Sequence, residues 1–487
     1  MKENKIKIII LSFLIIIGSY FIIGSVIGNE KFKNVFSFLT PEQKYQIKKY
    51  IFPYKLISEQ EKAIDEKQKK IGVREREKLK LKKLFHTFLY DLELKKKDGN
   101  TDIPITRSSL KLSNGKILEK YKLEEGFYYG INKQPPLALG SGYIDFFEDK
   151  IFVLSGRGIL AYRKNLNGDE EHFKQIRNNL NKFIGRDQFK KHEWFSFKDI
   201  YIFKDQILIS YTEEVKEDCW NTSILKGRID FENIKFEKFF SRKECISTVT
   251  NIDKEFNGHQ SGGRIITFDD NHILFSVGEY RSRHLAQNKE SVNGKIIKIN
   301  FNTSDYEIIS MGHRNPQGLL YDKDNNFLLN SEHGPLDGCE INLIDLNKNK
   351  DDNIPNYGWP VASYGEHYGG KIPRNKKKYE KYPLYKSHSE HGYIEPLKAF
   401  VPSVGVSEMV QIAKNKYVVS SMGMRDKKGN DRPGDKSLYF FEINDERKLI
   451  NLEQLKVFER IRDLRFKDKK LYIFMENTAS IGIIDLS

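Results

Sequence analysis

The chain has 487 residues, of which 39% are hydrophobic and 13% aromatic, and it carries a formal net charge of +15. This length allows two or more domains, or one large β domain with extensions, and the apolar fraction supports a packed core. No basic motif with interleaved aromatic residues accompanies the lysines, so we expect no nucleic-acid partner. A basic surface that faces anionic lipid or an anionic envelope polymer explains the charge equally well.

The three cysteines, Cys219, Cys245 and Cys339, do not form a CxxC or Cys/His pattern, which argues against a structural zinc site. Cys219 and Cys245 flank a single predicted strand pair. They form a disulfide if the compartment is oxidising, and otherwise they are two buried thiols. If these two cysteines pair, Cys339 has no cysteine left to pair with.

The N-terminus combines Lys2, Lys5 and Lys7 with an uncharged apolar run over residues 8–27. That run has the length of a membrane-spanning helix and lacks a good signal-peptide cleavage site. We interpret residues 1–29 as a cytoplasmic tip and an uncleaved transmembrane anchor. The lysines place the N-terminus in the cytoplasm, so in a bacterium the rest of this single-pass inner-membrane protein would lie in the periplasm.

Residues 30–135 are expected to form a helical stalk, or collar, and a linker. Apolar residues recur at helical spacing along one stripe: Leu81, Phe85, Phe88 and Leu92. A single stripe of this kind is typical of a helix that packs on a neighbouring domain. Residues 98–135 are predicted to be a polar connection with turns at 99–100 and 113–115.

After Pro136 the sequence changes to short apolar and aromatic strands separated by turn residues. Several segments share one layout, in which a strand ends in an aromatic residue and an Asp/Asn/Lys turn leads into a second apolar strand: FKDQILISY, FDDNHILFSVG, YDKDNNFLLNSEHG and FKDKKLYIFMEN. Recurrence of this unit over about 350 residues predicts an all-β fold, a β-propeller over residues 136–487. The polar loops that follow the apolar runs would then meet at one mouth of the central channel.

Residues 312–360 hold the densest set of polar and turn residues, in the pieces GHRNPQGLLYD, SEHGPLDGCEINLI and NYGWP. Glycine and proline at this density mark backbone that turns sharply or approaches something closely. Tight β-turns with incidental polar residues are the simpler interpretation of any one piece. Together they predict a binding or catalytic site.

His259 and Glu279 are the candidate base and its orienting carboxylate. His259 lies in the glycine-rich segment NGHQSGGR, and Glu279 follows the next predicted strand. A carboxylate beside a histidine can fix its tautomer and raise its basicity. A histidine that is merely hydrogen-bonded in a turn explains the same residues equally well.

Three further groups have chemistry suited to an anionic cofactor and a cation. The guanidinium of Arg314 suits a carboxylate or quinone oxygen, or else it is a surface residue in a turn. The carbonyls of Gly334 and Pro335 are hard oxygen ligands appropriate for Ca²⁺. Arg460 and Arg462 alternate, so both point to one strand face, which is either a solvated edge or a site for a polyanion.

From about residue 136 to the end, the chain resembles the soluble glucose/sorbosone dehydrogenase family. The matching pieces are HQSGGRI, VGE, GHRNPQGL, EHGPLDGCEINLI, NYGWP, VPSVGVS and ERIRDL. The resemblance implies a six-bladed β-propeller that uses pyrroloquinoline quinone and Ca²⁺ to oxidise a sugar or related alcohol. It specifies neither the sugar nor the electron acceptor.

The resemblance also implies a role for each candidate residue. His259 matches the base that takes the hydroxyl proton, and Glu279 stands where a carboxylate orients it. Arg314 matches the arginine beside the quinone oxygens, with Asn315 next to it. The Gly334 and Pro335 carbonyls match the calcium ligands, and Arg460 and Arg462 match arginines that pair with the cofactor's carboxylates.

Two departures from the family pattern motivate an alternative function. Cys339 replaces an aspartate, so a weak ligand or hydrogen-bond acceptor is lost, and a lysine that contacts the cofactor is missing from the expected strand end, where Arg425 stands nearby. The leading hypothesis is a membrane-anchored quinoprotein-type dehydrogenase. The alternative is a catalytically degenerate propeller that binds a glycan or an envelope protein.

Overall fold

A computed structural model describes residues 102–123, 142–164, 166, 168, 170–191, 195–347, 353–423 and 434–487, together with Glu66, Arg74 and Glu77. The chain divides into two units, Met1–Leu81 and Lys82–Ser487. The three described residues of the first unit are helical. The predicted anchor at residues 8–27 lies outside the described residues. Within the described part of the chain, no helix has the length and apolar character needed to cross a membrane.

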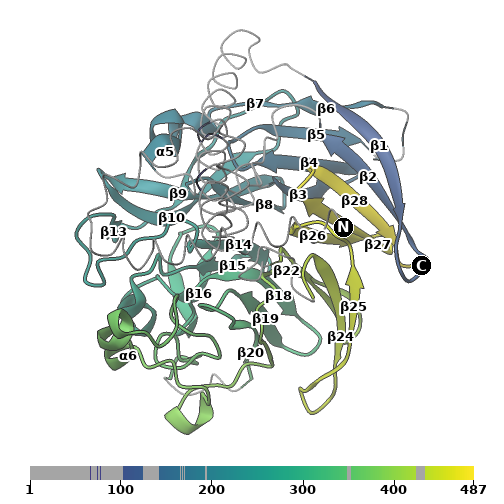
Figure 1. The fold of residues 1–487 in the computed structure, drawn as a ribbon. Coiled ribbons are helices and arrows are strands. Elements are labelled where there is room, and N and C mark those ends of the chain that lie inside the picture. The colour runs from purple at the N-terminus through teal and green to yellow at the C-terminus, as the bar shows by residue number, and fades with distance from the viewer. Residues whose placement is uncertain are drawn as a thin grey trace, which may run out of the picture. The chain divides into compact units, whose positions relative to one another are not determined.

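The described part of the second unit consists of six groups of antiparallel strands arranged around a common centre (Figure 1). The first three groups are β3 (Gly142–Phe147), β4 (Lys150–Ser155), β5 (Leu160–Lys164) and β6 (His172–Gln175); β8 (Phe197–Phe203), β9 (Gln206–Lys216), β10 (Cys219–Arg228) and β12 (Glu237–Phe240); and β14 (Gly262–Thr267), β15 (His272–Val277), β16 (Lys295–Asn300) and β17 (Tyr306–Met311). The next two are β18 (Pro316–Asp322), β19 (Phe327–Glu332), β20 (Cys339–Asp345) and β21 (Lys398–Phe400); and β22 (Val406–Ala413), β23 (Lys416–Ser421), β24 (Ser437–Ile443) and β25 (Leu449–Lys456). The sixth is β26 (Ile461–Lys467), β27 (Lys470–Met475), β28 (Ser480–Asp485) and β2 (Ile117–Leu123), extended by β1 (Ile103–Lys111).

Short elements lie outside these groups. The strands are β7 (Arg177–Asn178), β11 (Asn233–Ile234) and β13 (Ile246–Ser247), and the helices are η1 (Leu180–Lys182), α5 (Arg186–Lys191), η2 (Arg283–Gln287), η3 (Pro373–Asn375), α6 (Lys376–Lys381) and η4 (Ser389–His391). The first strand of each group contacts the first strand of the next, in the closed cycle β3, β8, β14, β18, β22, β26 and back to β3. This is the arrangement of a β-propeller, so the predicted all-β propeller is confirmed.

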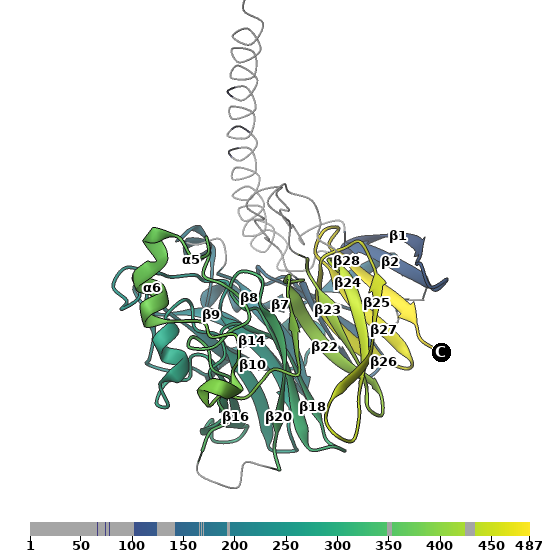
Figure 2. The ribbon, with the colours of Figure 1, turned by 60° about the horizontal axis from the view of Figure 1, so that its bottom comes forward.

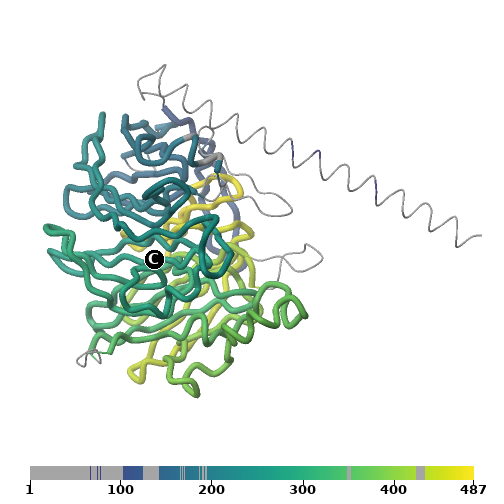
Figure 3. The backbone as a smooth tube through the Cα atoms, turned by 90° about the vertical axis from the view of Figure 1, so that its left-hand side faces the viewer, coloured from purple at the N-terminus to yellow at the C-terminus, as the bar shows by residue number. Residues whose placement is uncertain are grey.

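The last sheet is completed by a strand from the N-terminal side of the chain. Strand β2 pairs with both β28 and β1, with Leu118 opposite Ile484. Figures 2 and 3 show the C-terminal strands, in yellow, beside this N-terminal segment. The segment 98–135, which we expected to be a polar connection, therefore contains a β hairpin that belongs to the propeller. The predicted turn at 113–115 joins its two strands.

The hairpin went unrecognised because β1 is largely exposed and carries polar residues, so it lacks a strong apolar alternation. Strand β2 has a mixed pattern in which Leu118 faces one neighbouring sheet and Tyr121 and Leu123 face the other. Because successive side chains of a strand point to opposite faces, this strand is buried on both sides. Its apolar residues are too few to predict a strand from the sequence.

Hydrophobic clusters fill the space between each pair of neighbouring sheets. Between the first and second sheets, Phe152 and Leu154 pack with Ile207 and Ile209, all buried. Equivalent clusters occupy the other five boundaries of the ring. Burial of each large aliphatic side chain contributes about 1.5–3 kcal/mol, so closure of the ring rests mainly on these layers.

A buried charge network joins the inner strands at the centre. Arg264 of β14 bonds to Asp199 of β8 and Asp463 of β26, both at 2.8 Å, and to Glu408 of β22 at 2.7 Å. Arg465 contacts Asp463 at 3.0 Å. Burial raises the pKa of Asp199 and of Glu408, although the two arginines act in the opposite direction. Such a network fixes the mutual register of the strands that carry it.

Cys219 and Cys245 form a disulfide, and Cys339 is a buried thiol. The disulfide was one of the two alternatives left open by the sequence. It joins the start of β10 to the residue just before β13, so it fixes the segment that leads toward His259.

Candidate active site

The candidate residues lie at one end of the sheets because of how antiparallel strands connect. In such a sheet, the start of an inner strand and the end of the second strand share an edge. His259, Arg314 and Arg460 precede inner strands, whereas Glu279 and Glu476 follow second strands. The loops that hold them therefore meet around the central channel, as the propeller prediction requires.

The three motif pieces of residues 312–360 pack directly on one another. Gly312 adopts φ +76°, and a Cβ there would lie 2.2 Å from the Asn356 side-chain oxygen. Only glycine combines this left-handed backbone with such a close approach. The Gly312 carbonyl accepts from the Trp359 N–H at 3.0 Å, which brings the NYGWP segment beside Arg314.

Arg314 is 4% exposed and is fixed from several sides. Its Nη1 donates to the His333 carbonyl at 2.7 Å, and its backbone N–H donates to Glu332 at 2.9 Å. The guanidinium lies 5.4 Å from the ring centroid of Trp359 and 6.0 Å from that of Tyr368. The predicted turn arginine is thus a buried, oriented cation.

Gln260 connects Arg314 with Glu279. With its amide nitrogen facing Glu279, Gln260 donates to Oε1 at 2.7 Å, and its oxygen accepts from Arg281 at 3.1 Å and Arg314 at 2.9 Å. Glu279 is fully buried. Burial raises its pKa to about 7, although Arg283 and Arg314 lower it. The structure thus brings the predicted Glu279 and Arg314 together through a residue that the sequence did not single out.

His259 lies in the same electrostatic environment. Its removal from water, and then the positive charges of Arg281 and Arg314, hold its pKa well below 6.5. The imidazole is therefore neutral at neutral pH, which is the form that can accept a proton. The backbone N–H of His259 donates to the Asn257 side chain at 3.1 Å, so the loop itself is held in place.

A second chain of contacts connects Asn315 with the two C-terminal arginines. The Asn315 side-chain oxygen accepts from Gln317 at 3.0 Å, and the Gln317 oxygen accepts from Arg462 at 3.2 Å. Glu476 forms ion pairs with Arg462 at 2.6 Å and with Arg460 at 3.1 Å. Arg460 and Arg462 thus share one face, as their alternation predicted, and one carboxylate holds both.

Positive charge exceeds negative charge in this region. Burial, Arg462 and Arg157 lower the pKa of Lys198 to about 7, and Glu476 only partly offsets them. Burial and the nearby arginines, Arg314 among them, likewise lower the pKa of His333 to about 3. These shifts indicate that the site favours a ligand with negative charge.

The loop after β19 is tightly folded on glycines. A Cβ on Gly334 would lie 1.6 Å from the Gly338 carbonyl, so no other residue fits there. Cys339 begins β20 behind this loop, with its sulfur 2.5 Å from the Ser403 hydroxyl. Burial raises the pKa of the Cys339 thiol, whereas Ser403 and nearby backbone N–H groups lower it. Sulfur thus occupies an acceptor position among donors.

The predicted metal ligands are backbone carbonyls rather than side chains. Among the described residues, no group of three His, Cys, Asp or Glu side chains is placed to hold a metal ion. Gly334 and Pro335 remain a prediction, as does direct pairing of Glu279 with His259. Arg425 lies outside the described residues.

Several residues of the site were missed at the sequence level: Gln260, Gln317, Lys198, His333 and Glu476. Gln260 and Gln317 stand inside the quoted motifs, next to singled-out residues, and that proximity was the available signal. Glu476 follows the apolar run of β27, so it fits the rule that polar residues after such runs reach the channel. Lys198 had no comparable signal.

The sequence model of the family described as Glucose / Sorbosone dehydrogenase matches residues 198–483. The chain belongs to this family. This confirms the resemblance inferred from the motifs. It also agrees with the fold, since the matched segment runs from β8 to β28.

Two curated relatives illustrate the similarity. Aldose sugar dehydrogenase YliI of Escherichia coli is 30% identical over 188 residues, which are 35% of this chain and 46% of that protein. Quinoprotein glucose dehydrogenase B of Acinetobacter calcoaceticus is 32% identical over 142 residues, 23% of this chain and 28% of that protein. The matches thus span about half of the curated relatives or less.

Solved structures show the same fold. The apo form of the soluble aldose sugar dehydrogenase of Escherichia coli superposes with a TM-score of 0.53 and 20% identity, covering 71% of this chain and 96% of that chain. A crystal structure of a glucose dehydrogenase gives a TM-score of 0.52 with the same identity and coverage. At this identity the likeness concerns the fold alone.

Proposed function

We propose that this protein is a quinoprotein-type dehydrogenase that oxidises a sugar or related alcohol with pyrroloquinoline quinone and Ca²⁺. The observation that carries the proposal is the placement of His259, a histidine kept neutral by burial and by Arg281 and Arg314, in a site with excess positive charge. Membership of the Glucose / Sorbosone dehydrogenase family supports the reaction class.

The residues present fit such a cofactor. Pyrroloquinoline quinone carries several carboxylates, and the positive charges of Arg462 and Arg157 help to depress the pKa of Lys198. A ligand carboxylate there would be attracted by these positive charges. Arg314 and Asn315 would hold the quinone edge, Arg460 and Arg462 the carboxylates, and the carbonyls of Gly334 and Pro335 the calcium ion.

When bound, the quinone would accept a hydride from the sugar, and the calcium ion would polarise the quinone. His259 would take the proton from the sugar hydroxyl, which its neutral imidazole can do. Glu279 and Gln260 would hold Arg314 in place, because Gln260 bonds to both. The ring of Trp359, which is 4% exposed and 5.4 Å from the Arg314 guanidinium, would limit the access of water to this edge.

The alternative is a propeller that binds a glycan or an envelope protein without turnover. The observation that favours it is Cys339, which stands where the family pattern has an aspartate. Turnover and cofactor binding separate the two functions. Reduction of a dye by the protein with pyrroloquinoline quinone, Ca²⁺ and a panel of aldoses would support the dehydrogenase. If calorimetry detects no binding of the cofactor, the dehydrogenase is ruled out.

We also propose that residues 8–27 anchor the protein in the bacterial inner membrane with the propeller in the periplasm. The Cys219–Cys245 disulfide supports this location, because disulfides persist in oxidising compartments. Labelling of an engineered surface cysteine by a membrane-impermeant maleimide in whole spheroplasts tests the orientation. Labelling only after lysis contradicts it.

A further inference from the structure

A cavity of about 350 Å³ adjoins the candidate active site. It is lined by Glu255, Arg281, Arg283, Tyr368, Arg374, Asn375 and Lys378. Arg281 and Arg283 come from the segment after β15, whereas the last four residues come from the loop before α6 and from α6 itself. A volume of this size can hold part of a sugar-sized ligand.

Two of the lining residues also belong to the candidate active site. Arg281 lies 5.1 Å from the ring centroid of Tyr368 and donates to Gln260 at 3.1 Å. The Tyr368 hydroxyl lies 3.4 Å from Arg314. Arg281 is also the charge that most strongly depresses the pKa of His259 after burial. The cavity and the site of His259 therefore share a wall.

The cavity has more positive than negative charge. Four cations line it against a single carboxylate, Glu255. That carboxylate is already used, because Arg283 bonds to it at 2.6 Å and Lys378 bonds to it as well. Arg281 and Arg374 form no ion pair among the contacts of the described residues. Their charges remain available to an anion that enters the cavity.

The backbone also adopts a disfavoured conformation to place Arg281. Tyr280 and Arg281 have φ angles of 51° and 68°, in the left-handed region that residues with a Cβ avoid. Disfavoured backbone of this kind is found often at active sites and ligand clamps. The side chain of Tyr280 is fully buried, and this burial stabilises the turn. The next residue, Arg281, lines the cavity.

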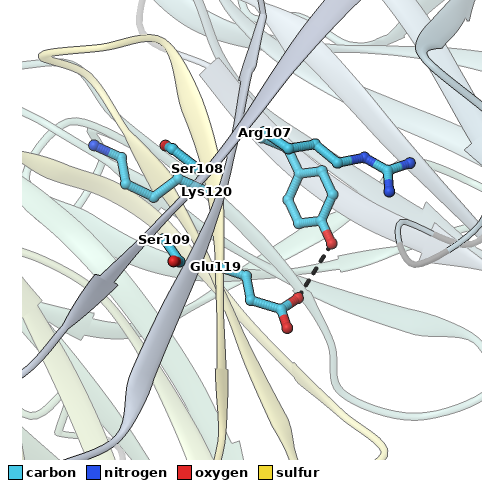
Figure 4. A pocket seen from close by; sticks show the side chains of 6 residues that line it. Arg107, Ser108, Ser109, Glu119 and Lys120 are labelled. Carbon is cyan, nitrogen blue, oxygen red and sulfur yellow. Dashed lines mark hydrogen bonds between the residues drawn. The ribbon is translucent and has the colours of Figure 1, made fainter.

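Another cavity in the described part of the chain has a smaller excess of positive charge. It has a volume of about 390 Å³ and lies on the hairpin of β1 and β2 (Figure 4). Arg107 and Lys120 line it together with Glu119, which is hydrogen-bonded to Tyr121 at 3.1 Å. Two cations face one carboxylate there, and Lys120 is already paired with Glu459 at 2.7 Å.

We propose that the cavity around Arg281 and Arg374 binds an anionic group of the substrate, so that the preferred substrates are acidic sugars. The anionic group is a carboxylate or a phosphate ester, and it is carried by an aldose whose reducing end reaches His259. The inference rests on the proposed function and specifies its substrate class. Guanidinium groups bind both anions in paired hydrogen bonds.

The kinetic test compares glucose, glucuronate and glucose 6-phosphate, which share the same reducing end. With the full chain, pyrroloquinoline quinone and Ca²⁺, we expect kcat/KM for at least one acidic sugar to exceed that for glucose about tenfold or more. Arg374→Gln should lower this ratio about tenfold through KM, and so should added salt. Lys377→Gln, which removes an exposed lysine of α6 outside the cavity, should leave the ratio unchanged.

A binding measurement keeps this proposal separate from the proposed function. Calorimetry without cofactor should detect glucuronate or glucose 6-phosphate binding that Arg374→Gln weakens and Lys377→Gln does not. If only glucuronate binds, the recognised group is a carboxylate. If only glucose 6-phosphate binds, it is a phosphate ester. Turnover of glucose without preference for either acidic sugar overturns the anion site while the dehydrogenase stands. Binding of acidic sugars without turnover of any aldose contradicts the dehydrogenase while the anion site stands.

Discussion

At the scale of single residues, the candidate site is defined by its concentration of positive charge. The pKa of Lys198 shows this most clearly, because desolvation, Arg462 and Arg157 lower it to about 7. A neighbouring anionic ligand would raise this pKa again, which makes the charge of Lys198 a reporter of binding.

This predicts proton uptake when pyrroloquinoline quinone binds at pH 8. At that pH Lys198 is mostly neutral, because its pKa is about 7, and a neighbouring ligand carboxylate would raise the pKa and protonate the amine. Calorimetry in buffers of different ionisation enthalpy should show uptake of close to one proton. In Lys198→Met the uptake should disappear, and equal uptake in both proteins would contradict the assignment.

The residues of the site differ in how far the sequence could disclose them. His259, Arg314 and Arg462 stand in recognisable motifs, and the structure places them around one channel. Lys198 could not be predicted, because a lysine inside an aromatic strand segment looks like a solvated residue until the neighbouring strands are in place. Gln260 bridges Glu279 and Arg314, which stand on loops of two neighbouring sheets, and no sequence spacing encodes this relation.

At the scale of elements, strand β2 closes the ring with a segment more than 350 residues away in the sequence. Short apolar and aromatic runs revealed many of the strands from residue 142 onwards, because both faces of these strands pack against neighbouring sheets. The hairpin of β1 and β2 was hidden because its outer strand is exposed and polar. Pairing between Leu118 and Ile484 is a tertiary fact that the local pattern cannot supply.

Leu118→Asp should therefore destabilise the propeller strongly. Leu118 is fully buried between sheets, so a carboxylate there loses its hydration and the apolar contacts are lost, at a cost of at least about 3 kcal/mol. Ile117→Asp, one residue earlier on the same strand at a side chain that is 48% exposed, should change the unfolding free energy by less than about 1 kcal/mol. Urea unfolding of both variants makes the comparison. Equal effects would mean that β2 does not close the ring.

The Cys219–Cys245 disulfide should stabilise the second sheet. It closes a loop with a sequence separation of 26 residues, for which restriction of the unfolded chain contributes about 3 kcal/mol. Dithiothreitol should lower the Tm of the wild type and of Cys339→Ser. The Cys219→Ser/Cys245→Ser double variant should start from a lower Tm and show no further response. A wild-type Tm insensitive to complete reduction would contradict this role.

At the scale of the whole molecule, the buried network around Arg264 joins strands from four sheets. Asp199, Glu408 and Asp463 surround this one guanidinium, and Arg465 assists it. The sequence showed these residues only as scattered charges in apolar strands. Their convergence follows from the closure of the ring, so it became visible only with the fold.

Arg264→Met should destabilise the protein by about 3–5 kcal/mol near pH 8, because three buried carboxylates lose the nearer of their two arginines. Burial already raises the folded-state pKa of Asp199 and Glu408 above the unfolded values. A raised carboxyl pKa means that stability is lost as pH rises through it, so the deficit of the variant should shrink near pH 5. Arg228→Met, at an exposed pair with Asp205, should change stability by less than about 1 kcal/mol. A deficit for Arg264→Met that does not depend on pH would contradict the network.

The most direct test of the central claim is the kcat of His259→Ala with pyrroloquinoline quinone, Ca²⁺ and an aldose. If His259 is the base, kcat should fall by a factor of about 10²–10⁴ while calorimetry still detects cofactor binding. His272→Ala, at a surface turn with Asp269, should keep the wild-type rate. A His259→Ala protein that binds the cofactor and turns over at the wild-type rate would contradict the account.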